Sequence, residues 1–404
     1  MKSEERRAIR RARREEKRRR KREERARECT LEKVADLNSL YKAQREAARG
    51  VGWKASTQRY QWHWLLKIAG ARKALLAGEE ICRGFHEFDI TERGKPRHIS
   101  SVHFSERVVQ KSLTQNVLVP AIVPSLILDN TANIKGRGTA FAIERTKMYL
   151  ARHYAAHGAD GYVLQGDFSN YFGSIPHAGV FDLLERHVTD PGARALARHM
   201  VEVQGEVGLG LGSEPNQIYA VSYPNPLDHF IAECCGVGAY VRYMDDFIII
   251  HPDKSDLWAI AAALYDMTRQ MGLVFHPKKT HVTKLTRGFV FLKKKFTYDR
   301  QTGGVVVRPC RESVTRERRR IKRQAGLVAS GKMTAEQLNQ AYQSWRGSLT
   351  DLNAHRTKLG MDALFASLTH GATGRAAAWP PPDGEMQTGP GGATQAKGAS
   401  EWTN

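Results

Sequence analysis

The chain has 404 residues, of which 41% are hydrophobic, with 63 Lys and Arg against 42 Asp and Glu and a formal net charge of +21. This composition predicts a soluble globular protein of two or three domains, and the lack of an apolar run near ~20 residues argues against a membrane span or a membrane partner. The positive charge predicts nucleic acid as a partner, while five cysteines without a CxxC pair argue against a zinc ribbon and favour a cytoplasmic location.

Residues 1–50 are predicted to form a basic helical extension. Residues 1–28 contain 15 Lys or Arg and 7 Glu, and acidic and basic side chains recur four positions apart at Glu15–Arg19, Glu16–Arg20 and Glu23–Arg27. This spacing supports a solvated helix. We expect an arm that lies on RNA or on a partner, the alternative being a purely solubilising helix.

The remaining chain divides into four further segments. Residues 51–160 form a predicted fingers region, with a helix over Trp53–Gly84, paired strands over Phe85–Ser101 and a helix over Glu106–Val123. Residues 161–300 alternate strand-like and helical stretches, as in an α/β domain. Residues 301–370 are basic and helical, and residues 371–404 have the low complexity of a disordered tail.

The most informative feature is a set of three acids at the ends of apolar strands. Asp245 and Asp246 lie between two strand-like stretches within Tyr240–Ile250, which predicts a hairpin with both acids at its turn. Asp167 follows a strand that begins at Tyr162. Nucleotidyl transfer needs hard oxygen ligands for Mg²⁺ from converging strands, and this pattern would supply them.

The residues around these acids resemble the reverse transcriptases. Tyr243-Met244-Asp245-Asp246 matches the signature of that family. Other stretches resemble its motifs in the same order: the first fingers motif in Lys95–Ile99, the second in Asp129–Gly138, the first palm motif in Asp167–Phe172, the next palm motif in Gly208–Gln217, the lysine motif in Leu273–Thr280 and the primer grip in Phe289–Leu292.

The resemblance implies a right-hand polymerase of α/β class, with fingers, an α+β palm and a short helical thumb. It implies RNA-directed DNA synthesis with two Mg²⁺ ions, for which Mn²⁺ can substitute, and template RNA, nascent DNA and dNTPs as partners. The implied metal ligands are Asp167, Asp245, Asp246 and the backbone of Phe168; the implied nucleotide contacts are Lys135, Arg137, Phe172, Gln217 and Lys279; and the implied nucleic-acid contacts are Lys95, Arg97, Phe291, Leu292, Arg318 and Arg346.

Gln217 indicates which reverse transcriptases the chain resembles. A glycine followed five residues later by Gln, here Gly212 and Gln217, is similar to the enzymes of diversity-generating retroelements, although they have Ser where this chain has Asn216. The stretch Ser344–Asn353 resembles the thumb of the same bacterial group. We therefore expect such an enzyme, acting with an accessory protein. The alternatives are a defence-associated bacterial reverse transcriptase, with an unusual template or none, and a catalytically silent RNA-binding protein on the same fold.

Overall fold

The computed structural model describes residues 3–92 and 94–370, which form two compact units. Unit 1 extends to Cys310 and unit 2 begins at Arg311. The predicted tail, residues 371–404, lies outside the described residues. The predicted thumb was expected from residue 301, but residues 305–309 form a strand of unit 1, so the helical unit begins ten residues later than the sequence indicated.

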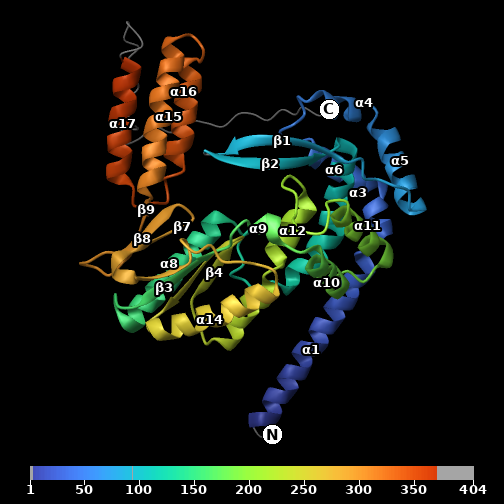
Figure 1. The fold of residues 1–404 in the computed structure, drawn as a ribbon, viewed down its shortest axis with the longest axis horizontal. Helices are drawn as coiled ribbons and strands as arrows, with labels where there is room; N and C mark the ends of the chain where they lie inside the picture. Colours follow the sequence, from blue (N-terminus) through green and yellow to red (C-terminus); the bar gives the residue numbers. More distant parts are fainter. Residues whose placement is uncertain (1–2, 93, 371–404) are drawn as a thin grey trace, which may run out of the picture. The chain divides into compact units, whose positions relative to one another are not determined.

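The described residues of the first unit form many helices together with three antiparallel sheets (Figure 1). Its helices are α1 (Ser3–Glu28), α2 (Leu31–Ala35), α3 (Leu37–Ala47), α4 (Ala55–Trp62), α5 (Trp64–Ala77), α6 (Phe104–Leu113), α7 (Val119–Ile122), α8 (Thr139–His157), α9 (Tyr171–Ser174), α10 (His177–His187), α11 (Pro191–Glu202), α12 (Glu214–Ser222), α13 (Asn225–His229) and α14 (Lys254–Gln270), with the short π and 3-10 segments η1 (Thr114–Leu118), η2 (Val123–Ser125), η3 (Phe230–Cys234) and η4 (Leu285–Arg287).

Each of the predicted fingers, palm and primer grip contains strands of a different sheet. Strands β1 (Phe85–Glu92) and β2 (Lys95–Val102) form a hairpin, which confirms the predicted pairing. The palm sheet has the order β4-β5-β3-β6, from β3 (Tyr162–Asp167), β4 (Tyr240–Tyr243), β5 (Asp246–His251) and β6 (His281–Lys284). A third sheet has the order β7-β8-β9, from β7 (Phe289–Phe291), β8 (Lys294–Tyr298) and β9 (Val305–Pro309).

The palm sheet is buried around β5, whose four central residues Phe247–Ile250 are all buried. Helix α14 packs against β3 and β5, and helix α8 packs against β4 and β5. Gly166 lies opposite Phe247 across β3 and β5, and a Cβ atom at Gly166 would overlap the Phe247 ring. Glycine at this position therefore lets the aromatic ring pack directly beside the strand end that carries Asp167.

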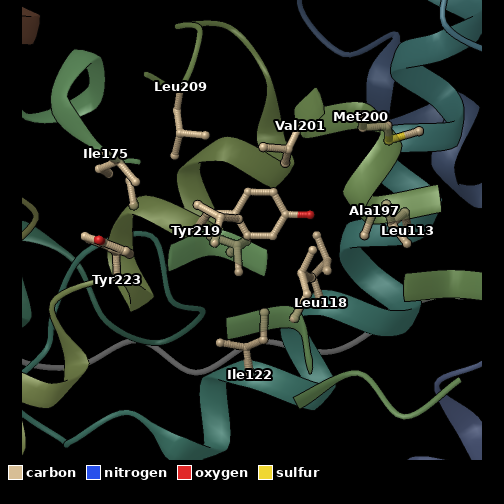
Figure 2. Close-up of a cluster of buried hydrophobic side chains, with 14 of the residues drawn as sticks. Leu113, Leu118, Ile122, Ile175, Ala197, Met200, Val201, Leu209, Tyr219 and Tyr223 are labelled. Atoms are coloured by element: carbon tan, nitrogen blue, oxygen red, sulfur yellow. The ribbon is translucent and has the colours of Figure 1, made fainter. Parts of the chain in front are cut away.

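A second part of the core joins the predicted fingers region to the predicted palm. Figure 2 shows the ring of Tyr219, on α12, among apolar side chains from separate elements: Leu113, Leu118, Ile122, Ile175, Ala197, Met200, Val201, Leu209 and Tyr223. Tyr219 is completely buried, and burial raises the pKa of its hydroxyl. This packing fixes α12, and with it Gln217, against the helices of the fingers.

The predicted N-terminal extension has two different parts. The described side chains of α1 from Ala12 to Glu24 are exposed, and ion pairs form within the helix, between Arg19 and Glu16 at 2.9 Å and between Arg20 and Glu24 at 3.4 Å. These partners differ from the expected ones. From Cys29 onward the chain joins the core, where Leu40 and Ala43 are fully buried. The solvated arm therefore ends near residue 28 rather than residue 50.

Over residues 311–370, unit 2 is a bundle of three helices, α15 (Arg311–Ala329), α16 (Ala335–Gly347) and α17 (His355–His370). Its core includes Ile321, Leu338 and Met361, and the rings of Tyr342 and Phe365 stack with their centroids 4.2 Å apart. A reciprocal capping box between Thr334 and Gln337 starts α16. None of the helices of residues 3–92 and 94–370 combines the length and the apolarity that a bilayer crossing requires.

Candidate active site

Two of the predicted catalytic acids lie at the tight turn that joins β4 to β5. Tyr243 pairs with Asp246, which leaves Met244 and Asp245 as the two turn residues. Met244 has φ of 57°, in the left-handed region that most side chains avoid. Such a strained conformation costs about 1–3 kcal/mol and persists only where surrounding contacts hold it. The turn brings Asp245 to the end of the palm sheet.

The third acid lies directly beside this turn. Asp167 ends β3 and pairs with Asp246 on β5, so the three carboxylates converge. Burial and then the charge of Asp167 raise the pKa of Asp245 above its usual range, and the same causes, with Asp245 added, raise the pKa of Asp246 to about 8. Mutual repulsion of this kind is what a bound cation relieves.

Two predicted basic residues act on this cluster. The Lys279 ammonium lies 2.7 Å and 2.9 Å from the two carboxylate oxygens of Asp167, and its side chain is 47% exposed, compared with 14% for Asp167. The positive charges of Lys279 and, to a smaller extent, of Arg97 on β2 oppose the rise in the pKa of Asp245. The structure thus brings two of the predicted cationic residues to the acids.

The predicted Phe168 and Phe172 follow Asp167 on the way into α9. The Phe168 side chain is buried and stacks on Phe275 with ring centroids 5.0 Å apart, so it is part of the core and only its backbone can face the acids. Phe172 is half-buried at the start of α9, and its carbonyl accepts a hydrogen bond of 2.8 Å from the N–H of Leu209. This bond ties Phe172 to the glycine-rich loop.

The glycine-rich loop, residues 208–212, is held by a buried residue that the sequence marks only as a departure from the family pattern. Asn216 is 1% exposed, and its amide donates to Gln204 Oε1 at 2.7 Å and to the Gly210 carbonyl at 2.9 Å. The N–H of Gly210 donates to the same Gln204 oxygen at 2.9 Å. Asn216 therefore fixes the loop beside Phe172.

Three predicted nucleotide contacts meet at the loop of residues 127–138, which we call the fingers loop. Arg137 Nη1 donates to the carbonyls of Ile127 and Asn130, at 2.7 Å and 2.8 Å, and so closes the loop. Lys135 is exposed on it. Gln217 is also exposed and accepts a hydrogen bond of 3.0 Å from Asn133. The structure thus brings Lys135, Arg137 and Gln217 into one region, with Arg137 positioned as a structural clamp.

The predicted primer grip faces the same acids through its backbone. Phe291 is fully buried, so the accessible part of this motif is the turn at Leu292 and Lys293, which have φ of 49° and 61°. The pKa of Asp246 is raised by burial and by the charges of Asp167 and Asp245, and the backbone N–H of Leu292 offsets a small part of that rise. Gln165 on β3 donates to the Val290 carbonyl at 2.7 Å. These contacts attach the β7-β8 hairpin to the palm sheet.

The other predicted nucleic-acid contacts are spread over both units. Arg318 is exposed on α15. Arg346 on α16 donates to both carboxylate oxygens of Asp362, at 2.9 Å and 3.3 Å, so it also helps to join α16 to α17. The Lys95 backbone lies in β2, while its side chain lies outside the described part of the chain.

One comparison with known proteins shows the family of this chain. The family model described as "Reverse transcriptase (RNA-dependent DNA polymerase)" matches residues 87–298, just over half of the chain. A search of curated proteins found no significant match.

Solved telomerase structures are similar at low sequence identity. One is a Candida albicans telomerase in complex with a fragment of telomeric RNA, with 12% identity and a TM-score of 0.44 over 71% of this chain and 55% of the other. Another is an apo Candida tropicalis telomerase, with 11% identity and a TM-score of 0.42 over 56% and 48%. The chain spans about half the length of these telomerases. By the family match, the chain belongs to the reverse transcriptases, the family described as RNA-dependent DNA polymerases.

Proposed function

We propose that this polymerase extends a primer on an RNA template by two-metal nucleotidyl transfer at Asp167 and Asp245. The observation that carries the proposal is the convergence of three carboxylates from β3, β5 and the turn before β5, two of them with raised pKa. Isolated carboxylates that repel one another in a buried site are costly unless cations neutralise them. Their oxygens are also the ligand type that Mg²⁺ prefers.

The donor set fits a pair of Mg²⁺ ions, for which Mn²⁺ can substitute. Asp167 and Asp245 would hold them, with the Phe168 backbone nearby, and Asp246 would support the site from its position between the catalytic turn and Leu292. When bound, such ions activate the primer 3′-hydroxyl and stabilise the leaving pyrophosphate.

The other residues would orient the incoming nucleotide and the primer. Lys135 on the fingers loop and Lys279 beside Asp167 would contact the triphosphate, and Lys279 would supply a proton to the pyrophosphate. Phe172 would stand against the sugar, where an aromatic ring excludes a 2′-hydroxyl. The turn at Leu292 would hold the primer end near the acids.

Substitution of the acids by amides tests this assignment. Asp245→Asn keeps the volume of the side chain but weakens its affinity for a hard cation, so incorporation should fall to background. Thermal stability and RNA affinity should stay close to those of the wild-type protein. An Asp245→Asn protein that retains more than ~1% of wild-type incorporation, with the same metal, would remove Asp245 from the site.

For the biological role, we propose a diversity-generating retroelement, in which the enzyme copies a template RNA with an accessory protein. The support is the spacing of Gly212 and Gln217, which is similar to that of the diversity-generating enzymes, together with the exposure of Gln217 beside Asn133 of the fingers loop. The experiment is to sequence the RNA and DNA that copurify with the protein. A repeated template matching a nearby variable gene supports this role. A defence gene cluster with no such template would instead support the anti-phage alternative.

A further inference from the structure

Behind the catalytic turn lies an ion pair that is almost completely buried. The side chain of Arg242 on β4 is 1% exposed and that of Asp228 on α13 is 0% exposed. Arg242 Nε donates to Asp228 Oδ1 at 2.7 Å and Nη2 donates to Oδ2 at 2.5 Å, which is a two-point contact. The Tyr240 hydroxyl donates to Asp228 Oδ1 at 2.6 Å, so the carboxylate is well satisfied.

Two further hydrogen bonds of the Arg242 guanidinium hold the turn that carries Asp245 and the neighbouring helix α12. Nη1 donates to the carbonyl of Met244 at 2.9 Å, and Nη2 also donates to the carbonyl of Val221 on α12 at 2.9 Å. Met244 is the turn residue with φ of 57°, and Asp245 follows it directly. A planar guanidinium anchored on Asp228 therefore fixes the carbonyl orientation of the strained residue next to the acid.

The backbone of Arg242 holds the fingers loop at the same time. Its N–H donates to the Asp129 carbonyl at 2.9 Å, and its carbonyl accepts from Thr131, from the N–H at 2.9 Å and from Oγ1 at 2.8 Å. Between them, Asn130 donates to the carbonyl of Val221 at 3.0 Å. One residue of β4 is thus bonded to the catalytic turn through its side chain and to the fingers loop through its backbone.

Resting on the function proposed above, we propose that Arg242, anchored by Asp228, is a positioning residue. It holds Asp245 and the fingers loop in fixed positions relative to each other. Stability alone does not account for the pair, because well-packed apolar side chains of similar volume commonly replace a buried ion pair without loss. What apolar side chains cannot replace is the hydrogen bond to Met244. We call the pair of Arg242 and Asp228 the brace. It acts through the turn and touches neither substrate nor metal.

Two variants test the brace. Arg242→Lys keeps the positive charge beside Asp228 but cannot span the carbonyls of Met244 and Val221 together. If the Arg242→Lys protein does not fold, the double variant Arg242→Met with Asp228→Leu is tested instead. It removes both charges together with the hydrogen bond to Met244. Leu184→Ala is the control: Leu184 is a buried core residue on α10, outside the site described above. Each full-length protein is assayed for melting temperature, RNA affinity, kcat, dNTP KM and half-saturating Mg²⁺.

We expect the Arg242 variants to lose about 100-fold in kcat, the loss that a displacement of ~1 Å at a reacting group produces. Half-saturating Mg²⁺ and dNTP KM should rise together, RNA affinity should not change, and excess Mg²⁺ should restore part of the rate. Leu184→Ala should lose activity only in proportion to its unfolded fraction. Folded Arg242 variants with the kcat and Mg²⁺ dependence of Leu184→Ala would overturn the brace.

An Asp245→Asn arm separates this proposal from the function on which it rests. If Asp245→Asn is inactive while the folded Arg242 variants behave as the control does, the metal assignment stands and the brace fails. If Asp245→Asn retains activity, the metal assignment fails, and the brace fails with it because the turn would carry no ligand.

Discussion

Lys279 and Asp167 form a salt bridge in which the ammonium contacts both carboxylate oxygens, at 2.7 Å and 2.9 Å. The lysine comes from the segment before β6 and the aspartate from the end of β3, so the salt bridge links that segment to the strand end that carries Asp167. Any Mg²⁺ that binds Asp167 must share this carboxylate with the ammonium. Under the proposed function, the lysine and the metal would compete for Asp167 and, once substrate is bound, would both contact the triphosphate.

The two proposed roles of Lys279, competitor of Mg²⁺ at Asp167 and proton donor to pyrophosphate, predict that one substitution will improve Mg²⁺ affinity and lower kcat. Lys279→Gln removes the competing charge, so half-saturating Mg²⁺ should fall. It also removes the group that we propose as the proton donor to pyrophosphate, so kcat at saturating Mg²⁺ should fall by about 100-fold, within the range for a general acid. Steady-state incorporation across a Mg²⁺ titration measures both. A fall in kcat with an unchanged Mg²⁺ dependence would show that the salt bridge does not compete with metal.

The proposed position of Phe172 predicts that its ring makes the enzyme select deoxynucleotides over ribonucleotides. Replacement by Val should raise kcat/KM for ribonucleotides while that for deoxynucleotides changes little, because a steric wall acts only on the larger substrate. The half-buried ring also contacts Tyr171, with centroids 5.8 Å apart, so the melting temperature should be measured alongside. Equal losses with both nucleotide sets would identify Phe172 as a core residue.

Removal of α1 predicts a change in salt dependence. The helix carries many Arg side chains, and the described side chains between Ala12 and Glu24 are exposed, although Glu partners neutralise some of the charge. Deletion of residues 1–28 should lower RNA affinity and reduce the slope of log affinity against log salt by ~0.7–0.9 for each phosphate that the protein no longer binds. Incorporation at saturating template should stay unchanged. Identical slopes for both proteins would mean that the helix does not lie on RNA.

Glu106 predicts a pH dependence of stability. It is 2% exposed on α6, and burial raises the pKa of its carboxyl above the usual value of 4.5. Because the folded state holds this proton more tightly than the unfolded state, Glu106 contributes stability at low pH that declines as pH rises from about 4.5 to its raised pKa. Glu106→Gln removes the titration, so the difference in unfolding free energy between variant and wild type should shift in favour of the variant across that window. Denaturant unfolding at several pH values would measure it, and a constant difference would contradict the assignment.

The sequence predicted the turn between β4 and β5 because its residues are contiguous. Asp245 and Asp246 between two apolar strands indicate a hairpin in any context, and Asp167 at a strand end adds the third acid. The order of the neighbouring motifs then predicted the fingers hairpin and the primer grip, and the structure places Arg97 and Lys279 near the acids.

Long-range partners could not be predicted in the same way. Arg242 lies within the signature strand, but nothing local marks Asp228, fourteen positions earlier, as its buried partner. Asn216 differs from the family pattern, and only the fold shows its bonds to Gln204 and Gly210. Residues 29–47 looked like a continuation of the charged arm, although Leu40, Ala43 and Ala47 recur at the three- and four-residue spacing of a buried helix face.

The position of β4 at the border of the palm sheet has a consequence for solubility. Its sequence, Tyr240-Val241-Arg242-Tyr243, is apolar enough to recruit a strand from another molecule, and an open edge of this kind promotes aggregation. The outward N–H and C=O of Arg242 are instead occupied by Asp129 and Thr131. The fingers loop therefore also shields the sheet from strand addition, so substitutions that loosen it should make the protein aggregate as well as lower its activity.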